Sequence, residues 1–435
     1  MAKRLCAGIL ALCLAVLLGG CGSISFQNVN ELLRAPAMGQ GLDEIQKALK
    51  GYLGGEEPQY KYPKGGDERS PIIRTDLNGD GREEAILLYS VSEATGLHPD
   101  KGSSVYVAVM EQVEGNWTVI QDVRGLSTEV ASLEVADLLG DGSLQLIIGY
   151  ASANLTAKVL ALYQYLDFTL QETMNYNYSR YEIGDFTGRG GQELVVVSRE
   201  EEASRLQLYY VPARDGRFVT EEIEPVTLDT NFITCVGISP SAGPNDTRLL
   251  VVDGNSSTDT GALTSQLVYY EPKRDVFIAD EVNPLRGSAG RSSPLLLSRD
   301  VDGDGIVEIP QQRNLPGIQT SGSSHTLQFV DWMDFTGQEA AIKQFGLMDT
   351  TQRLYVSFPE DWRGEILVED SSQSGGWVVK ARASRQVLLS LLALQRGEDP
   401  PLGALRVPGS TTYLVFSSRL AEAERAQINA LELTT

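Results

Sequence analysis

The chain has few residues that work through sulfur or imidazole: 435 residues include four cysteines and two histidines. Cys6 and Cys13 lie in an N-terminal leader, and Cys21 directly follows it. Only Cys235 remains in the body of the chain, so no intrachain disulfide can form there. The apolar stretch from 232 to 237 predicts that Cys235 is a buried strand residue, with a reactive thiol as the alternative.

Recognisable catalytic motifs are also missing. The sequence contains no HExxH zinc motif, no Gly-x-Ser-x-Gly nucleophile elbow and no phosphate-binding Gly-x-x-x-x-Gly-Lys loop. His98 and His325 are unrelated in spacing, and both are predicted to lie in surface loops. We therefore expect that the protein is not an enzyme. The 58 acidic residues nevertheless leave a carboxylate-based hydrolase or lyase as the alternative.

Positive charge is scarce. There are 36 basic residues against 58 acidic ones, which gives a net charge of −22 and an isoelectric point of about 4.6. Such a surface repels phosphate backbones, so we expect no nucleic-acid partner. The hydrophobic share of 42% is enough for a large core, and the length suits two or three domains.

Long apolar runs are absent after the N-terminus. The run from Leu5 to Leu18 follows two basic residues and is too short to span a bilayer. It ends in the sequence LGGC, which resembles the bacterial lipobox and implies that Cys21 is acylated. We expect a lipoprotein signal peptide over 1–20, a tether over 21–40, and an exported protein anchored to the outer face of the cytoplasmic membrane by Cys21. The alternative is an ordinary secretory signal with an incidental cysteine.

Acidic, glycine-rich loops recur four times ahead of apolar runs. The two best copies are DLNGDGREE from Asp76 and DVDGDGIVE from Asp300, with oxygen-bearing side chains at positions 1, 3, 5 and 9 and glycine at position 6. This pattern brings several oxygens together at a sharp turn, as a hard cation such as Ca²⁺ requires. A standard EF-hand is excluded, because position 12 is Leu87 or Gln311 and a strand follows the loop.

Short β-branched and aromatic runs follow the loops in a repeating order of about fifty to sixty residues. Four strands per repeat predict an all-β propeller of about five four-stranded blades over 58–346. The fifth repeat lacks a strand, so we expect the N-terminal strand at 70–74 to close the ring by joining the last blade. A stacked β-solenoid or two sandwiches are the alternatives.

The loops and the strands that follow them resemble FG-GAP and VCBS-type repeats, as in integrin α-chain propellers, and the chain from 18 to 370 is similar to VCBS-repeat lipoproteins. The resemblance implies structural Ca²⁺, with the Arg82 and Ile306 carbonyls as additional ligands. The implied ligands are Asp76, Asn78, Asp80, Arg82 and Glu84 in loop one, and Asp300, Asp302, Asp304, Ile306 and Glu308 in loop four. Weaker ligand sets are implied at Asp137 and Asp141 in loop two, and at Asp185, Thr187 and Glu193 in loop three.

Loops two and three depart from the pattern. Leu139 and Gln145 replace two oxygen ligands in loop two, and Arg189 stands at position 5 of loop three, where an internal pair with Asp185 is one expectation. Outside the repeat, 41–57 predicts an amphipathic helix and 347–435 a small α+β domain, in which 387–394 could be strand or helix. We expect a binding module for a surface glycan or protein, with a scaffold role as a further possibility.

Overall fold

The computed structural model describes residues 41–92, 98, 104–199, 206–218, 223–229, 232–256, 262–279, 291–293, 295–319, 326–336, 339–371, 376–394, 399–408 and 410–433. The predicted signal peptide, Cys21 and the tether lie outside this part of the chain, and so does His325. None of the described helices is long and apolar enough to cross a membrane.

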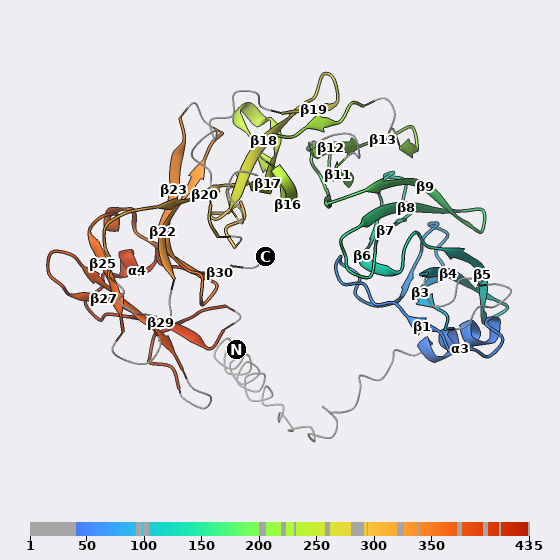
Figure 1. Cartoon of the computed structure of the whole chain (residues 1–435), viewed down its shortest axis with the longest axis horizontal. Helices are drawn as coiled ribbons and strands as arrows, with labels where there is room; N and C mark the ends of the chain where they lie inside the picture. Colours follow the sequence, from blue (N-terminus) through green and yellow to red (C-terminus); the bar gives the residue numbers. More distant parts are fainter. Residues whose placement is uncertain are drawn as a thin grey trace, which may run out of the picture.

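Strands form nearly all of the regular secondary structure of the described residues, in six sheets that follow one another along the chain and one two-stranded ribbon. Figure 1 shows these sheets along an open arc, with the first (blue) and the last (orange to red) at its two ends. Every pairing between neighbouring strands is antiparallel except that of β21 with β25. The described residues therefore form an all-β protein in which each sheet is built mainly from adjacent segments.

The first three sheets come from residues 59–227. Sheet one contains β1 (Gln59–Tyr60), β2 (Ile72–Thr75), β3 (Glu84–Ser90), β4 (Tyr106–Val113) and β5 (Asn116–Arg124). Sheet two contains β6 (Glu129–Ala136), β7 (Gln145–Ala151), β8 (Lys158–Leu166) and β9 (Thr169–Asn177). Sheet three contains β10 (Arg180–Gly184), β11 (Glu193–Arg199), β12 (Leu206–Val211) and β15 (Val226–Thr227), beside the ribbon of β13 (Ala213–Arg214) and β14 (Arg217–Phe218).

The other three sheets use the rest of the chain. Sheet four contains β16 (Phe232–Ala242), β17 (Arg248–Ser256), β18 (Leu263–Glu271) and β19 (Val276–Ala279). Sheet five contains β20 (Ile309–Arg313), β22 (Leu327–Asp334), β23 (Ala341–Asp349), β24 (Leu354–Phe358) and β30 (Ala430–Glu432). Sheet six contains β21 (Ile318–Gln319), β25 (Ile366–Asp370), β26 (Trp377–Ala381), β27 (Val387–Ala393), β28 (Leu405–Arg406) and β29 (Thr412–Phe416).

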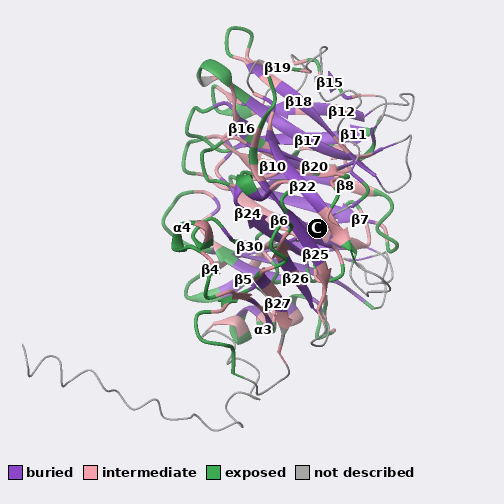
Figure 2. Ribbon diagram, turned by 90° about the vertical axis from the view of Figure 1, so that its left-hand side faces the viewer, coloured by how far each residue is buried: buried purple, intermediate pink, exposed green. Residues whose placement is uncertain are grey.

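Hydrophobic cores lie between neighbouring sheets. One core joins side chains of sheets one and two, another joins sheets three and four, and a third joins sheets five and six. Strands β3 and β7 are buried at every residue, because both of their faces are covered. This explains why they read as continuous apolar runs rather than alternating ones. In Figure 2 the buried strands fill the interior, and exposed residues gather at hairpin ends.

The predicted N-terminal helix is present as α3 (Leu42–Tyr52). Ile45 and Leu49 on its apolar face are fully buried, and they share a core with Leu87, Tyr89 and other residues of sheet one. The helix therefore packs against the sheet, as the sequence analysis expected.

Two expectations about the repeat need correction. The strand before the first acidic loop, β2, pairs with β3 of its own sheet and not with the last one. Loops one to three consequently connect two paired strands of the same sheet, β2–β3, β6–β7 and β10–β11, so they do not mark boundaries between sheets. Loop four lies directly ahead of β20, the first strand of sheet five, after an isolated bridge between Arg299 and Glu308. A regular strand order can be divided into repeats at any strand, and only the pairing shows which division is real. No described strand of sheet one pairs with sheet five or six.

The C-terminal expectation also needs correction. The boundary placed between 346 and 347 falls inside β23, and β30 returns to complete sheet five. Residues 387–393 form a strand, and the only α-helix described after α3 is the four-residue α4 (Glu422–Arg425). Most of this region therefore forms a sixth sheet rather than an α+β domain. Short 3₁₀ helices lie at Glu360–Trp362 and, earlier in the chain, at Pro244–Asp246.

Candidate functional site

The four acidic loops share one pattern of hydrogen bonds. In loop one the Asp76 carboxylate accepts the backbone N–H groups of Gly79 and Gly81, each at 2.8 Å. Asp137, Asp185 and Asp300 do the same in the other loops, at 2.6 to 3.0 Å. Both glycines of each loop have positive φ values, which side chains rarely adopt. The first aspartate therefore holds the turn in all four loops, whatever else the loop binds.

The ninth residue of each loop points inward and anchors the start of the turn. Glu84 Oε2 accepts the Leu77 N–H at 2.8 Å, and Glu308 Oε2 accepts the Val301 N–H at 2.9 Å. In loop two the neutral Gln145 makes the same bond to the Leu138 N–H at 2.7 Å. Glutamine can thus fill this structural role, so the negative charge of the two glutamates needs a separate explanation.

Burial raises the pKa of Glu84 and of Glu308 to about 7, and the aspartates of the same loops add to the rise. The backbone hydrogen bonds to Leu77 and Val301 act in the opposite direction but are outweighed. A bound cation would favour the ionised form of such a buried carboxylate. The two strongest loops therefore carry charge that the protein alone stabilises poorly.

Loop four has the donor set that best fits a hard cation. Carboxylate oxygens of Asp300, Asp302 and Asp304 all lie within 4.8 Å of one another. Glu308 is fully buried, and its Oε1 atom has no hydrogen-bond partner among the described residues. Lys343 Nζ contacts Asp304 Oδ2 at 2.7 Å and partly neutralises the cluster. The three exposed aspartates supply carboxylate oxygens of the kind Ca²⁺ prefers, and the same loop carries the buried Glu308 oxygen.

Loop one brings its predicted ligands into the same turn. Asn78 Oδ1 accepts the Asp80 N–H at 3.0 Å, and Asp80 Oδ1 accepts the Arg82 N–H at 2.8 Å. Asp302 and Asp304 make the equivalent bonds in loop four, at 3.2 and 2.8 Å. The corresponding residues of the two loops therefore have corresponding positions, which supports treating them as the same kind of site.

Loop two fits a cation poorly. The side chain at position 3 is that of Leu139, and Asp141 Oδ1 already accepts both the N–H and the hydroxyl of Ser143, at 2.9 and 2.6 Å. These bonds lower the pKa of Asp141.

Loop three also uses its oxygens within the protein. Glu193 accepts the Thr187 hydroxyl at 2.7 Å and the Tyr210 hydroxyl at 2.8 Å. The expectation that Arg189 pairs inside the loop with Asp185 is wrong: Arg189 Nη2 contacts Asp275 Oδ1 at 2.7 Å, in the turn between β18 and β19 of sheet four. An arginine contact between two sheets thus stands where loop four has the aspartate Asp304.

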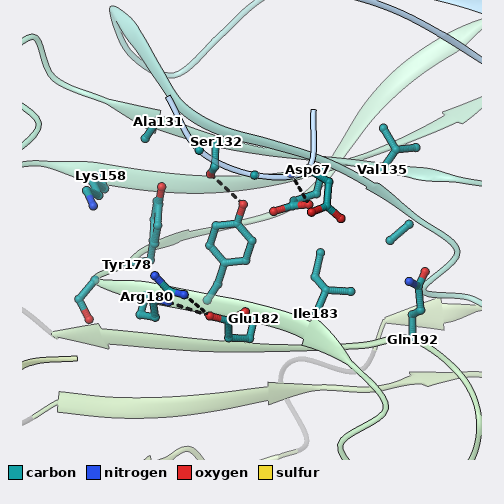
Figure 3. A pocket seen from close by; sticks show the side chains of 16 residues that line it. Asp67, Ala131, Ser132, Val135, Lys158, Tyr178, Arg180, Glu182, Ile183 and Gln192 are labelled. Atoms are coloured by element: carbon teal, nitrogen blue, oxygen red, sulfur yellow. Dashed lines mark hydrogen bonds and ion pairs between the residues drawn. The ribbon is translucent and has the colours of Figure 1, made fainter. Parts of the chain in front are cut away.

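A second feature, which the sequence analysis missed, is a cavity of about 330 Å³ between β6 of sheet two and β10 of sheet three (Figure 3). The segment at Gly65 and Gly66 lies along β6, where Gly65 forms a parallel bridge with Ser132. A Cβ atom on Gly66 would lie 2.3 Å from the Leu133 carbonyl oxygen, so only glycine permits this close approach. The two glycines place Asp67 at the edge of the cavity.

Two tyrosines form an aromatic corner in this cavity. The rings of Tyr178 and Tyr181 are 5.4 Å apart at an angle of 68°, an edge-to-face arrangement. Lys158 Nζ lies 5.7 Å from the Tyr178 ring, and the Tyr181 hydroxyl donates to Ser132 Oγ at 2.7 Å. Burial raises the pKa of both tyrosines, so both are neutral hydroxyls at physiological pH.

Charged groups surround the aromatic corner. Glu134 Oε2 accepts the Asp67 N–H at 3.1 Å, and Arg180 Nε donates to Glu182 Oε1 at 2.8 Å. Burial raises the pKa of Glu134, with smaller contributions from the charges of Asp67 and Glu182. The tyrosine-rich stretch YNYSRY at 176–181 is the only local signal that pointed here, because the opposite wall comes from residues 65–67 and 131–136.

His98 does not lie at the surface as expected. It is 1% exposed, and its Nε2 atom lies 2.6 Å from Asp122 Oδ2 and 3.0 Å from the Tyr89 hydroxyl. The Tyr89 hydroxyl also donates to Asp122 Oδ2, at 2.8 Å. The histidine therefore belongs to a buried polar cluster of sheet one. Cys235 is 4% exposed in β16, which confirms the expectation of a buried strand residue.

Comparisons with known proteins give distant likenesses alone. No protein-family model matches the chain, and no curated protein matches it. A solved Lactobacillus plantarum protein is similar over 74% of this chain and 83% of its own, with 9% identity and a TM-score of 0.26. A Bacillus licheniformis rhamnogalacturonan lyase is similar over 56% of this chain and 58% of its own, with 12% identity and a TM-score of 0.22. A fructofuranosidase from Schwanniomyces occidentalis is similar over 78% of this chain and 65% of its own, with 8% identity and a TM-score of 0.26. The chain spans less than two thirds of both enzymes, and likenesses this distant carry no argument about function.

Proposed function

We propose that the chain is an exported lipoprotein, a calcium-stabilised β-propeller of the FG-GAP or VCBS kind that serves as a binding module for a glycan or protein at the cell surface. Six consecutive sheets with hydrophobic cores between neighbours support a propeller (Figure 1). In this proposal the arc closes into a ring, which would remove most exposed sheet edges.

The membrane anchor in this proposal is the acylated Cys21. The short apolar run, the small residues before the cysteine and the basic start support it. A lipid on Cys21 would hold the protein at the outer face of the cytoplasmic membrane without a spanning helix. Replacing Cys21 by serine should move the protein from the membrane fraction to the soluble fraction of the host; unchanged membrane association would refute the anchor.

The observation that carries the calcium proposal is loop four, where three aspartates cluster and the buried Glu308 of the same loop has an oxygen without a hydrogen-bond partner among the described residues. Asp300, Asp302, Asp304 and Glu308 would hold the ion with the Ile306 carbonyl. The corresponding residues of loop one are Asp76, Asn78, Asp80 and Glu84, with the Arg82 carbonyl. The ion would supply positive charge among like charges, and its role is structural.

A second candidate function is an acid-based glycan hydrolase or lyase. One specific observation favours it: Glu134, with its raised pKa, lines the same cavity as Glu182. Glycoside cleavage uses two carboxyl groups that flank the scissile bond. We rank it second, because the Glu182 carboxylate is already paired with Arg180.

A thermal-unfolding titration tests the calcium proposal. The protein from residue 22 onward keeps every described residue and can be studied without lipid. If the dissociation constant is on the order of 10⁻⁴ to 10⁻³ M, as is typical of extracellular modules, 10 mM Ca²⁺ should add about 1.4 to 2.7 kcal/mol per site. An identical midpoint in EDTA and in Ca²⁺ would refute the proposal. A polysaccharide-cleavage screen with wild type and Glu134→Gln separates enzyme from binder.

A further inference from the structure

We infer that the cavity between β6 and β10 binds a neutral glycan, taking one or two sugar rings against Tyr178 and Tyr181. The inference rests on the proposed function as a binding module and assigns that module its site and ligand class. Figure 3 shows Lys158, Tyr178 and Arg180 grouped at one end of the cavity, and Asp67 and Gln192 at the other.

The aromatic corner gives the ligand a partly apolar surface. Two tyrosine rings at 68° present a ring face beside a ring edge rather than one flat stack. Such a corner offers an electron-rich face to the weakly positive C–H groups of a sugar ring. The hydroxyl of Tyr181 is already bonded to Ser132, so the rings are held in place before any ligand arrives. Fixed side chains lose little conformational entropy on binding.

The polar groups of the cavity suit a ligand that carries several hydroxyl groups better than a ligand that carries one charge. Asp67, Glu134 and Glu182 offer acceptor oxygens, whereas Lys158 and Arg180 offer donors, and Gln192 offers both. A sugar hydroxyl both donates and accepts, so neighbouring hydroxyls can use acceptors and donors that lie side by side. The two basic groups also have contacts of their own, with the Tyr178 ring and with Glu182, which orient them without a ligand.

Other ligand classes fit less well. Three carboxylates against two basic groups disfavour an anionic sugar or a phosphate, because like charges repel at short range. An apolar ligand would make no hydrogen bonds with the polar and charged groups that line the cavity. An extended peptide could not pair with β6, because the inner edge of β6 is already bonded to the chain at Gly65. The volume of about 330 Å³ lies at the small end of ligand sites, roughly 300 to 1,000 Å³, and suits one or two rings.

The test uses the protein from residue 22 onward on an array of neutral hexose and N-acetylhexosamine oligosaccharides, with polyuronates and de-N-acetylated amino-sugar oligomers alongside. We expect binding to at least one neutral glycan, measured afterwards by calorimetry. Tyr178→Ala should weaken that binding at least tenfold. The matched control is Tyr176→Ala, which removes a tyrosine two residues away that pairs with Tyr209 outside the cavity; it should change binding less than twofold.

Glu134→Gln keeps an acceptor oxygen but removes the charge, so it should weaken neutral-glycan binding less than Tyr178→Ala does. A loss equal to or larger than that of Tyr178→Ala would mean that charge rather than the aromatic corner carries recognition, and would overturn the inference. So would preferential binding of polyuronates, equal binding by Tyr178→Ala, or no binding to any neutral glycan. If Tyr178→Ala does not fold, Lys158→Met replaces it and should weaken binding at least threefold.

The calcium titration, run on the same protein, separates the two proposals. If the protein binds no neutral glycan on the array but is stabilised by Ca²⁺ as expected, the glycan site alone is overturned. Glycan binding without any Ca²⁺ response overturns the calcium proposal alone.

Discussion

Replacing Glu84 and Glu308 together by glutamine should stabilise the metal-free protein above neutral pH and abolish its response to Ca²⁺. Both side chains are at most 1% exposed, and each anchors a backbone N–H at the start of its loop. Gln145 makes the same anchoring bond in loop two, and its amide nitrogen lies 3.3 Å from the Ser143 carbonyl. The chain itself thus shows that glutamine fits this position of the turn.

The magnitude follows from the pKa of about 7 that burial gives each glutamate, against an ordinary value of 4.5. Between these values the folded protein binds more protons than the unfolded chain, so its stability falls as the pH rises. At pH 8 each ionised glutamate lowers the free energy of unfolding by roughly 3 kcal/mol. With an unfolding entropy near 2.1 cal/mol/K per residue, that corresponds to about 4 °C in Tm for a chain of this size.

The assay is thermal unfolding in EDTA at pH 5 and pH 8, repeated with 10 mM Ca²⁺ at pH 8. Wild type should lose stability from pH 5 to pH 8 in EDTA and regain part of it with Ca²⁺, whereas the double variant should do neither. Glu83→Gln is the control, because Glu83 is next in sequence but exposed, in a surface pair with Arg74. Equal pH dependence of wild type and double variant, or an unchanged Ca²⁺ response, would refute the reasoning.

Three further predictions concern single residues. Gly66→Ala should cost at least about 2 kcal/mol in urea unfolding, because its φ is 86° and its Cβ would meet the β6 backbone; Gly115→Ala, with a similar φ but open space, should cost less. Arg291→Met should cost roughly 3 to 5 kcal/mol, since it leaves Asp253 buried without its ion pair, and a cost below about 1 kcal/mol would contradict this. Burial raises the pKa of Cys235 to about 12, so Ellman's reagent should react only on unfolding; fast labelling of the native protein would contradict the burial.

Local signals were enough to predict the strands, the acidic loops and α3. Apolar runs such as 85–89 are strands because both faces are covered, and a glycine pair beside an aspartate fixes each turn through bonds within nine residues. These features depend on neighbouring residues in the chain, which a sequence pattern records directly. Because these patterns record only neighbouring residues, they did not show at which strand one repeat ends and the next begins.

Features that join distant segments could not be predicted from such patterns. His98 is buried because Asp122 and Tyr89 are brought to it from two strands, and Arg189 finds Asp275 in the next sheet. The cavity likewise needs residues 65–67 beside β6 and β10, and its first and last lining residues, Gly65 and Gln192, lie more than a hundred residues apart in the chain.

The amino-acid sequence by itself determined that the protein is built from short buried strands joined by loops with a conformation of their own, because the relevant contacts lie within a few residues. Tertiary structure alone decided which strands share a sheet, that β30 returns to sheet five, and where a cavity opens between two sheets. These depend on hydrogen bonds and packing between segments far apart in the chain, and identical local patterns are compatible with several such pairings.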